Sequence, residues 1–414
     1  MLFSEHDITI IVLVTLAGSY MVGLAADFLN LNHLNQPLPK EFTGHYDKNK
    51  YSDSQAYLKA NTKFGFITSS VDLAIILLFW FSGGFQTLDN FVRSFDFNSI
   101  VSGLFFTGLL LFLKLLISLP FSIYSTFVIE EKFGFNKTTP VLFFSDLIKS
   151  IALSAILGGI FLSLILGFLE SGGPWAWVMC WMGSTLFLLA VQYIVPTWIM
   201  PLFNKFTPLA DGPLKQAIVD YARSIDFSLS NIFVMDGSKR SSKSNAFFTG
   251  FGKNKRIVLL DTLIKEQSIE ELVSILAHEM GHFKKKHIIK RMIFSIFQMG
   301  FIFYLISIFI SHEGLFRAFF MEEVSIYAGL IFFGMLYTPI DLFISILFQI
   351  SSRKDEYEAD RFAAQTVKNS APLINALKKL SAHNLSNLTP HPFYVFLNYS
   401  HPPVLLRINT LKSL

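Results

Sequence analysis

The chain has 414 residues, of which 52% are hydrophobic and 15% are charged, with a formal net charge of +4. Soluble domains contain about 25% charged residues. The hydrophobic excess of this chain, which includes 46 Phe residues, is therefore expected to face lipid. The single cysteine, Cys180, excludes an intramolecular disulfide. The small net charge gives no indication of nucleic acid as a partner.

Seven apolar windows are each long enough to cross the hydrocarbon core of a membrane, which requires about 20 helical residues. They are residues 8–25, 64–85, 100–120, 150–169, 175–195, 292–311 and 327–350. The first window lacks a basic flank and a clean cleavage site, so it is predicted to be a membrane anchor and not a signal peptide. The sequence therefore predicts an all-α, multi-pass membrane protein.

The windows divide the chain into membrane and extramembrane segments. Residues 1–196 are predicted to contain five spans with short loops, and residues 291–350 the other two. Residues 197–290 and 351–414 are predicted to be cytoplasmic, because Lys and Arg residues concentrate on that side of the spans. This orientation places the N-terminus outside.

Asp72, Lys114 and Asp341 are ionisable residues inside predicted spans. A charge that faces lipid at mid-depth costs about 2.5 to 3.5 kcal/mol on insertion scales. These residues are therefore expected either to pair or snorkel locally, or to face a water-filled cavity between the helices.

The larger cytoplasmic segment contains a metal-binding pattern. Residues 256–260 form a β-branched, apolar run that predicts a strand, and Ser268 with Glu271 predicts a capping box at the start of a helix. This helix contains an H-E-x-x-H motif, residues 278–282. Residues four apart lie on one helix face, so both motif histidines can bind one ion, and zinc suits this geometry.

Within the motif, Glu279 lies about 100° around the helix from His278, so it can act on water at the metal without binding the metal. The alternative is a polar face with solvated histidines. Gly281 argues against it, because a merely structural face has no need of a poor helix former. The helix is expected to continue into the sixth span, with His287 pointing away from His282 and solvated.

A tetrahedral catalytic zinc site requires a third protein ligand. Beyond the seventh window, Glu356 and Asp360 lie one helical turn apart on a helix expected to continue from that span. Glu356 can bind the metal while Asp360 accepts the second N–H of a metal-binding imidazole. Asp355 and Glu358 lie nearby, so a charged helix face is the alternative, and spacing does not choose among the four carboxylates.

Together these patterns resemble the integral-membrane zinc metalloproteases that process CAAX-type prenylated proteins, the Ste24-like endopeptidases of peptidase family M48. The resemblance extends over essentially the whole chain. Its motifs are residues 120–136, 244–248, 252–261, 278–282, 356–360, and 400–403 followed by Arg407.

The resemblance implies that His278, His282 and Glu356 bind one zinc ion per chain. It also implies that Glu279 is the general base and later the general acid, and that Asp360 supports a ligand histidine.

The same resemblance implies that an extended substrate binds by strand addition near Asn245 and Ala246. It places His401 and Arg407 beside the metal, where they can steady the oxyanion. From sequence alone, His401 before two prolines is also typical of a turn residue.

The family fold is seven membrane helices around a large water-filled chamber, capped by a mostly helical zinc domain with a small β element. The chain is shorter than eukaryotic members and has small extramembrane loops, which indicates a bacterial inner-membrane protein. Bacteria generally lack protein prenylation, so the expected substrate is a peptide or protein with or without a lipid. Membrane lipid is the other expected partner, and no oligomer is required.

The sequence therefore predicts a zinc endopeptidase that cleaves extended or membrane-associated substrates, including CAAX-type ones, at the cytoplasmic face. One alternative is a quality-control protease for misfolded membrane proteins. The non-enzymatic alternative is a transporter or channel with a regulatory metal site, which paired short or broken spans would favour. No convincing pair is present in the sequence.

Overall fold

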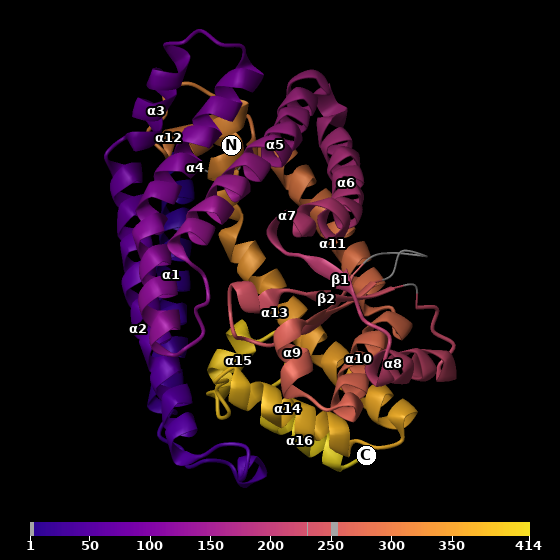
Figure 1. The fold of residues 1–414 in the computed structure, drawn as a ribbon. Coiled ribbons are helices and arrows are strands. Elements are labelled where there is room, and N and C mark those ends of the chain that lie inside the picture. Colours follow the sequence, from indigo (N-terminus) through magenta and orange to yellow (C-terminus); the bar gives the residue numbers. More distant parts are fainter. Residues whose placement is uncertain (1–3, 230, 250–255) are drawn as a thin grey trace.

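The computed structural model describes residues 4–229, 231–249 and 256–414. Within these residues, seven helices are long and apolar enough to cross a membrane, which confirms the seven predicted windows. They are α1 (Glu5–Asn32), α2 (Lys48–Phe81), α4 (Ser99–Tyr124), α5 (Pro140–Ser171), α6 (Ala176–Ile194), α11 (His287–Phe309) and α13 (Ile326–Val367). The chain ends lie at opposite ends of the molecule, as an odd number of spans requires (Figure 1).

The helices extend beyond the predicted windows at most boundaries, but α6 falls slightly short at both ends and α11 at its C-terminal end, and the largest shortfall is at the C-terminal end of the second span. Helix α2 was expected to reach residue 85 and ends at Phe81. There Gly83, at a φ of 70°, turns the chain into the short helix α3 (Gly84–Arg93). A positive φ is accessible to glycine at little cost, so this turn explains the early end.

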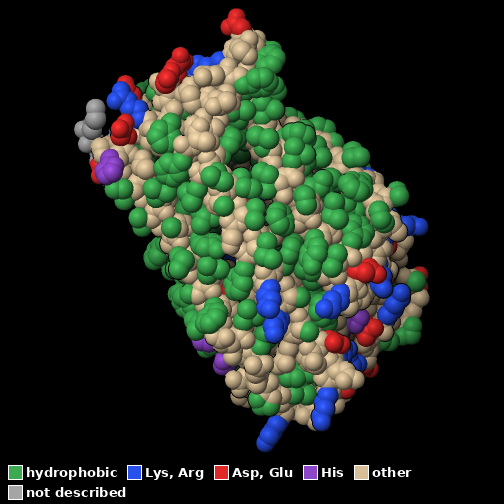
Figure 2. All heavy atoms as spheres, turned by 90° about the vertical axis from the view of Figure 1, so that its left-hand side faces the viewer, with side chains coloured by type: hydrophobic (Ala, Val, Ile, Leu, Met, Phe, Trp, Pro, Cys, Tyr) green, Lys and Arg blue, Asp and Glu red, His purple; other side chains and the backbone are tan. Residues whose placement is uncertain are grey.

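The spans are loosely packed against one another. Between 0% and 17% of the most apolar stretch of each span is buried within the protein. Hydrophobic side chains cover the broad middle of the surface in Figure 2. A solid helix bundle buries a continuous stripe of each helix, so the observed packing fits helices arranged around a chamber.

The two explanations for charges within the spans apply to different residues. Lys114 donates to Asp72 at 2.5 Å, which joins α4 to α2 by an ion pair. Asp341 instead lines a cavity of about 510 Å³ between α11 and α13, with Arg291 and Gln298 among its neighbours. Local pairing therefore accounts for two of the three residues, and a cavity for the third.

The extramembrane part combines helices with a small sheet. The sheet order is β1-β2-β4-β3, in which β2 and β4 are parallel and the other pairs antiparallel. Its strands are β1 (Phe206–Pro208), β2 (Asn231–Met235), β3 (Ala246–Thr249) and β4 (Arg256–Leu260). Strand β4 confirms the run predicted at 256–260. Residues 252–255 of the motif at 252–261 lie outside the described residues.

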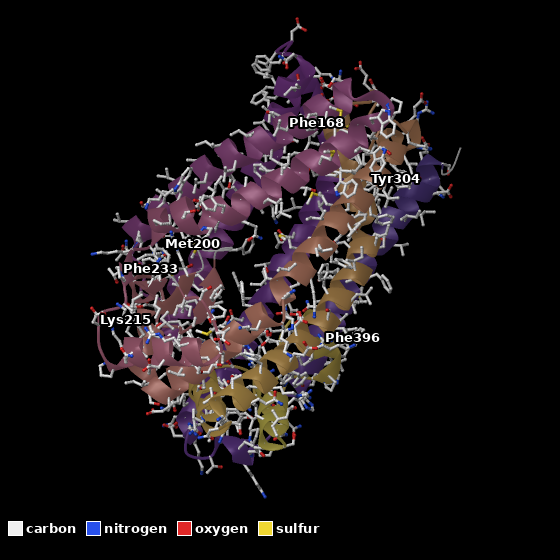
Figure 3. The ribbon with its side chains drawn as sticks, turned by 90° about the vertical axis from the view of Figure 1, so that its right-hand side faces the viewer. Phe168, Met200, Lys215, Phe233, Tyr304 and Phe396 are labelled. Atoms are coloured by element: carbon white, nitrogen blue, oxygen red, sulfur yellow. The ribbon has the colours of Figure 1, made fainter. Side chains whose placement is uncertain are left out.

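Helices pack against this sheet around one apolar core, in which Leu259 of β4 contacts the cluster containing Leu276 and Leu377. The helices are α8 (Pro213–Ser224), α9 (Asp261–Glu266), α10 (Ile269–Lys284), α14 (Ala371–His383), α15 (Pro392–Asn398) and α16 (Val404–Lys412). Two further short helices are α7 (Met200–Phe203) and, between the last two spans, α12 (Glu313–Arg317). Figure 3 shows Phe233 of β2 on one side of this part and Phe396 of α15 on the other.

The segment before β3 is fastened to the membrane helices. Two backbone hydrogen bonds join it to the turn after α4. The Ser242 N–H donates to the Phe135 carbonyl and the Lys137 N–H donates to the Arg240 carbonyl, each at 3.0 Å. Arg240 also makes a two-pronged ion pair with Asp146 of α5, at 2.7 and 3.0 Å. Two motifs that are far apart in sequence, 120–136 and 244–248, are thereby brought together.

Lys243 adds a second attachment between the same parts. Its ammonium lies 2.9 Å from a carboxylate oxygen of Glu130 and donates to the Tyr57 hydroxyl of α2 at 2.7 Å. The same ammonium lies over the Tyr57 and Phe135 rings, at 5.0 and 4.6 Å from the ring centroids. The position of β3 is therefore coupled to α2, α5 and the end of α4.

Helices α10 and α13 approach closely at Gly281. A Cβ atom at this position would lie 3.1 Å from Phe362 and 3.2 Å from the Cα atom of Ala359. Gly281 therefore has a structural reason that the sequence argument did not consider, because a Cβ at this position would fit only tightly against α13.

We predict that Gly281→Ala destabilises the protein. Alanine is favoured over glycine in helices by about 1 kcal/mol, but crowding in a packed interior costs about 1 to 3 kcal/mol, and Ala359 presents backbone atoms that cannot easily move. A lower Tm is the expected result. The matched control is Gly158→Ala on α5, where no atom lies within 4 Å of the added Cβ, and a Tm drop of equal size there would contradict the argument.

Candidate metal centre

Helix α10 begins as the sequence predicts and presents both motif histidines on one face. The Ser268 side chain accepts the Glu271 backbone N–H, and the Glu271 carboxylate accepts the Ser268 N–H, which completes the capping box. One turn apart, the Nε2 atoms of His278 and His282 lie 3.2 Å from each other. Both atoms therefore point toward one position in space.

Glu356 of α13 completes a group of three converging side chains. Its oxygens lie 3.4 Å from His278 Nε2 and 3.2 Å from His282 Nε2. Donors bound tetrahedrally to zinc at about 2.0 to 2.1 Å lie about 3.3 Å apart. Glu356 Oε2 is also buried without a hydrogen-bond partner among the described residues. These three side chains therefore fit a metal ion.

His278 is held from its other side by buried charges. Its Nδ1 lies 2.9 Å from Asp360 Oδ1, and Asp360 accepts two bonds from Arg407, at 2.8 and 2.6 Å. Burial alone would lower the pKa of His278, but the contacts with Asp360 and Glu356 outweigh it and raise the pKa to about 9. The surroundings of His278 thus favour a positive charge, which either a proton or a metal cation supplies.

His287 lies where the sequence analysis did not expect it. It is 1% exposed, its Nδ1 is 3.0 Å from Nδ1 of His282, and its Nε2 is 3.1 Å from Glu358. Helix α10 does not continue into the sixth span, because Lys286 adopts a left-handed conformation with a φ of 59° and the chain turns into α11. The expectations of a continuous helix and a solvated His287 were therefore wrong.

The four carboxylates after the seventh span have different surroundings. Glu356 and Asp360 face the histidines of α10, whereas Asp355 contacts Arg291 at 3.2 Å. The Glu358 side chain is 52% exposed and contacts only His287 among the ion pairs of the described residues. Helix α13 continues from the seventh span as expected. Of the four carboxylates, Glu356 and Asp360 are therefore the two that face the motif histidines.

A cavity of about 400 Å³ lies in front of the three converging side chains. Glu279 lines it beside His278, and burial raises the pKa of the Glu279 carboxyl, while the nearby histidines lower it to a smaller extent. Asn245, Ala246 and neighbouring residues of β3 line the same cavity. The motif residues and strand β3 thus face one space.

The structure also brings His401 and Arg407, both from the C-terminal segment, to this cavity. His401 lies in a loop, as a turn residue would, but its Nε2 is 3.4 Å from Glu356 and its side chain is 65% exposed. Arg407 lines the cavity as well, while most of its guanidinium is engaged by Asp360 and lies 3.5 Å from Glu356. The sequence reasoning missed His287, because the turn at Lys286 that brings it to His282 has no clear sequence signal.

Comparison with known proteins gives matches along both halves of the chain. The family model described as CAAX prenyl protease N-terminal, five membrane helices, matches residues 27–205, and the model of peptidase family M48 matches residues 208–414. A CAAX prenyl protease 1 homolog from Oryza sativa subsp. japonica is 38% identical over 386 residues, which cover 91% of this chain and 90% of the relative. CAAX prenyl protease 1 from Saccharomyces cerevisiae is 36% identical over 405 residues, covering 90% and 88%.

A solved structure is similar over nearly the full length. Ste24p of S. mikatae matches with a TM-score of 0.90 and 34% identity, covering 98% of each chain. These relatives are eukaryotic, so the bacterial source inferred from the short chain stays a prediction. Two family models, close relatives and a matching fold agree, and the chain therefore belongs to peptidase family M48, as a multi-pass membrane metalloprotease.

Proposed function

We propose that this protein is a zinc endopeptidase that cleaves extended peptides of the CAAX type at the membrane. The observation that supports it most is the convergence of His278, His282 and Glu356 in a cavity shared with Glu279 and the β3 edge. The three side chains would hold one zinc ion. Zinc, when bound, supplies the Lewis acidity that polarises a scissile carbonyl and makes water acidic enough to react near neutral pH.

The remaining roles belong to residues of the chain. The backbone near Ala246 pairs with an extended substrate and places its scissile bond in front of Glu279. Glu279 accepts a proton from the attacking water as the C–O bond forms, and it later gives a proton to the leaving amine as the C–N bond breaks. His401 and Arg407 steady the negative charge that develops on the carbonyl oxygen.

Asp360 orients His278 in this proposal. A carboxylate that accepts the second N–H of a metal-binding imidazole fixes its tautomer and its direction. Arg407 balances the charge of the buried Asp360, because an unpaired buried carboxylate would be costly.

The substrate class follows from the relatives, which are named for prenylated CAAX proteins. The orientation follows from charge: Lys and Arg residues concentrate in the segments that contain the site, which places the site at the cytoplasmic face and the N-terminus outside. The proposed organisation is five spans in residues 1–196, two in 291–350, and catalytic segments at 197–290 and 351–414.

We predict that Glu279→Gln keeps zinc and abolishes cleavage. The carboxamide fills the same space but cannot accept the proton of water. Zinc content measured by atomic absorption should match the wild type, while turnover of a CAAX-type peptide falls below detection. A chelator should abolish wild-type cleavage, and added zinc should restore it. Full activity of the variant would exclude the mechanism.

Recognition of lipid is tested by comparing a farnesylated CAAX-type peptide with the unmodified peptide of the same sequence. We expect the purified protein in lipid vesicles to cleave both, because the strand edge and Glu279 contact only the peptide backbone and the scissile bond in this proposal. A lower KM for the farnesylated peptide would show that lipid is recognised. Cleavage of neither peptide, with zinc bound, would refute the CAAX assignment.

We predict that His287→Ala weakens zinc binding by about 10- to 100-fold, as the loss of a hydrogen bond to a ligand histidine does in other metal sites. The readout is the zinc Kd from competition with a fluorescent chelator. Glu358→Ala should have a smaller effect, since Asp355 also lies 3.5 Å from His287. The control is Lys285→Ala, an exposed neighbour. If the folded His287→Ala variant bound zinc with wild-type affinity, His287 would have no role in supporting the zinc site.

A further inference from the structure

The backbone of β3 offers hydrogen-bonding groups on the side away from β4. Within the described residues, β3 is the last strand of the sheet. The Leu260 N–H donates to the Asn245 carbonyl at 3.2 Å, so Asn245 faces β4. Backbone groups of successive residues alternate between the two edges of a strand. The groups of Ser244, Ala246 and Phe248 therefore point to the opposite edge.

At Ser244 this edge is already occupied by one side chain. The Asn384 carboxamide oxygen accepts the Ser244 N–H at 3.0 Å, and the Asn384 amide group donates to the Ser244 carbonyl at 3.1 Å. A neighbouring strand would make the same pair of bonds with this residue. Asn384 thus takes the place of a strand partner at one backbone position.

The carboxamide is held firmly in this position. Asn384 directly follows α14, and its N–H donates to the Leu380 carbonyl at 3.0 Å. The preceding residue, His383, contacts the Ser242 carbonyl at 2.6 Å. Ser244 itself is 3% exposed. The blocked position therefore lies directly beside the cavity, which is lined by Asn245, the next residue in the chain, and by Leu380, the hydrogen-bond partner of Asn384.

The next position along the edge is partly blocked as well. The Ala246 N–H donates to the Asn245 side-chain oxygen at 2.9 Å. Among the described parts of the chain, the Ala246 carbonyl and both backbone groups of Phe248 therefore remain for an added strand. These residues line the cavity together with His278 and Glu356.

We propose that Asn384 is a positioning residue that closes the β3 edge at Ser244 and so fixes the register in which an extended substrate pairs with β3. The proposal rests on the proposed function and concerns which peptide bond is cleaved. A substrate strand that slides by one residue turns its side chains to the other face, so the nearest alternative register is displaced by two residues. Asn384 blocks that register on the side of Ser244.

The test is a product map of a synthetic peptide with a CAAX-type sequence, cleaved by the full-length, zinc-loaded protein and analysed by mass spectrometry. For Asn384→Ala we expect new products from a bond two residues from the main site. The Ser244 N–H and carbonyl, no longer bound to Asn384, can then form two hydrogen bonds with the substrate. These two bonds should raise the ratio of shifted product to original product by roughly tenfold. Zinc content should be unchanged, because Asn384 makes no contact with the ligand side chains among the described hydrogen bonds.

The matched control is Asn369→Ala at the other end of α14, where the asparagine oxygen accepts the Ala371 N–H at 3.0 Å. It should alter stability without altering the product map. If Asn384→Ala does not fold, Asn384→Asp replaces it, because the carboxylate still accepts the Ser244 N–H but no longer donates to the carbonyl. A smaller shift in the same direction is then expected.

An unchanged product map in a folded, zinc-loaded Asn384 variant would overturn the proposal. The same would follow if Asn369→Ala shifted the products equally. Absence of cleavage by the wild-type protein would instead refute the proposed function, so the two failures are distinguishable.

Discussion

The site depends on the close approach of α10 and α13 at Gly281 and Ala359. The two motif histidines lie on one helix and Glu356 lies on the other, so the distance between the helix backbones sets the distance between the three donor atoms that could hold a metal. A side chain at position 281 would meet backbone atoms of Ala359. Gly281 thus permits a close helix approach beside the site, where three donor atoms lie within 4.8 Å of one another.

The close packing of α10 against α13 also explains why so many charged groups are buried beside His278, His282 and Glu356. Each motif histidine directs Nε2 toward the other and is contacted at Nδ1 from behind, His278 by Asp360 and His282 by His287. Arg407 compensates Asp360, and Glu358 contacts His287. A buried charge is costly unless it is paired, and a ligand must be oriented to bind well. The polar groups behind the ligands meet both requirements.

The sequence was sufficient for features that local patterns determine. The seven spans follow from hydropathy, and the Ser268 capping box and the spacing of His278 and His282 follow from helix geometry. The contacts of His287 and Asn384 could not be predicted, because each depends on a turn or a helix end that brings together residues without a shared periodic pattern. Choosing Glu356 among four carboxylates likewise required either the resemblance or the observed orientation of α13.

The candidate metal ligands and strand β3 are attached to different membrane helices. Glu356 lies on the helix that forms the seventh span, and α11, which begins at His287, forms the sixth. Strand β3 is instead attached through Arg240 to α5 and through Lys243 to α2 and the end of α4. Strand β3 also packs directly on α10, because Ala246 belongs to the same apolar core as Leu276 and Ala277, and this packing sets its distance from the motif histidines. The polar attachments through Arg240 and Lys243 add to this packing and connect the same strand to the loosely packed spans.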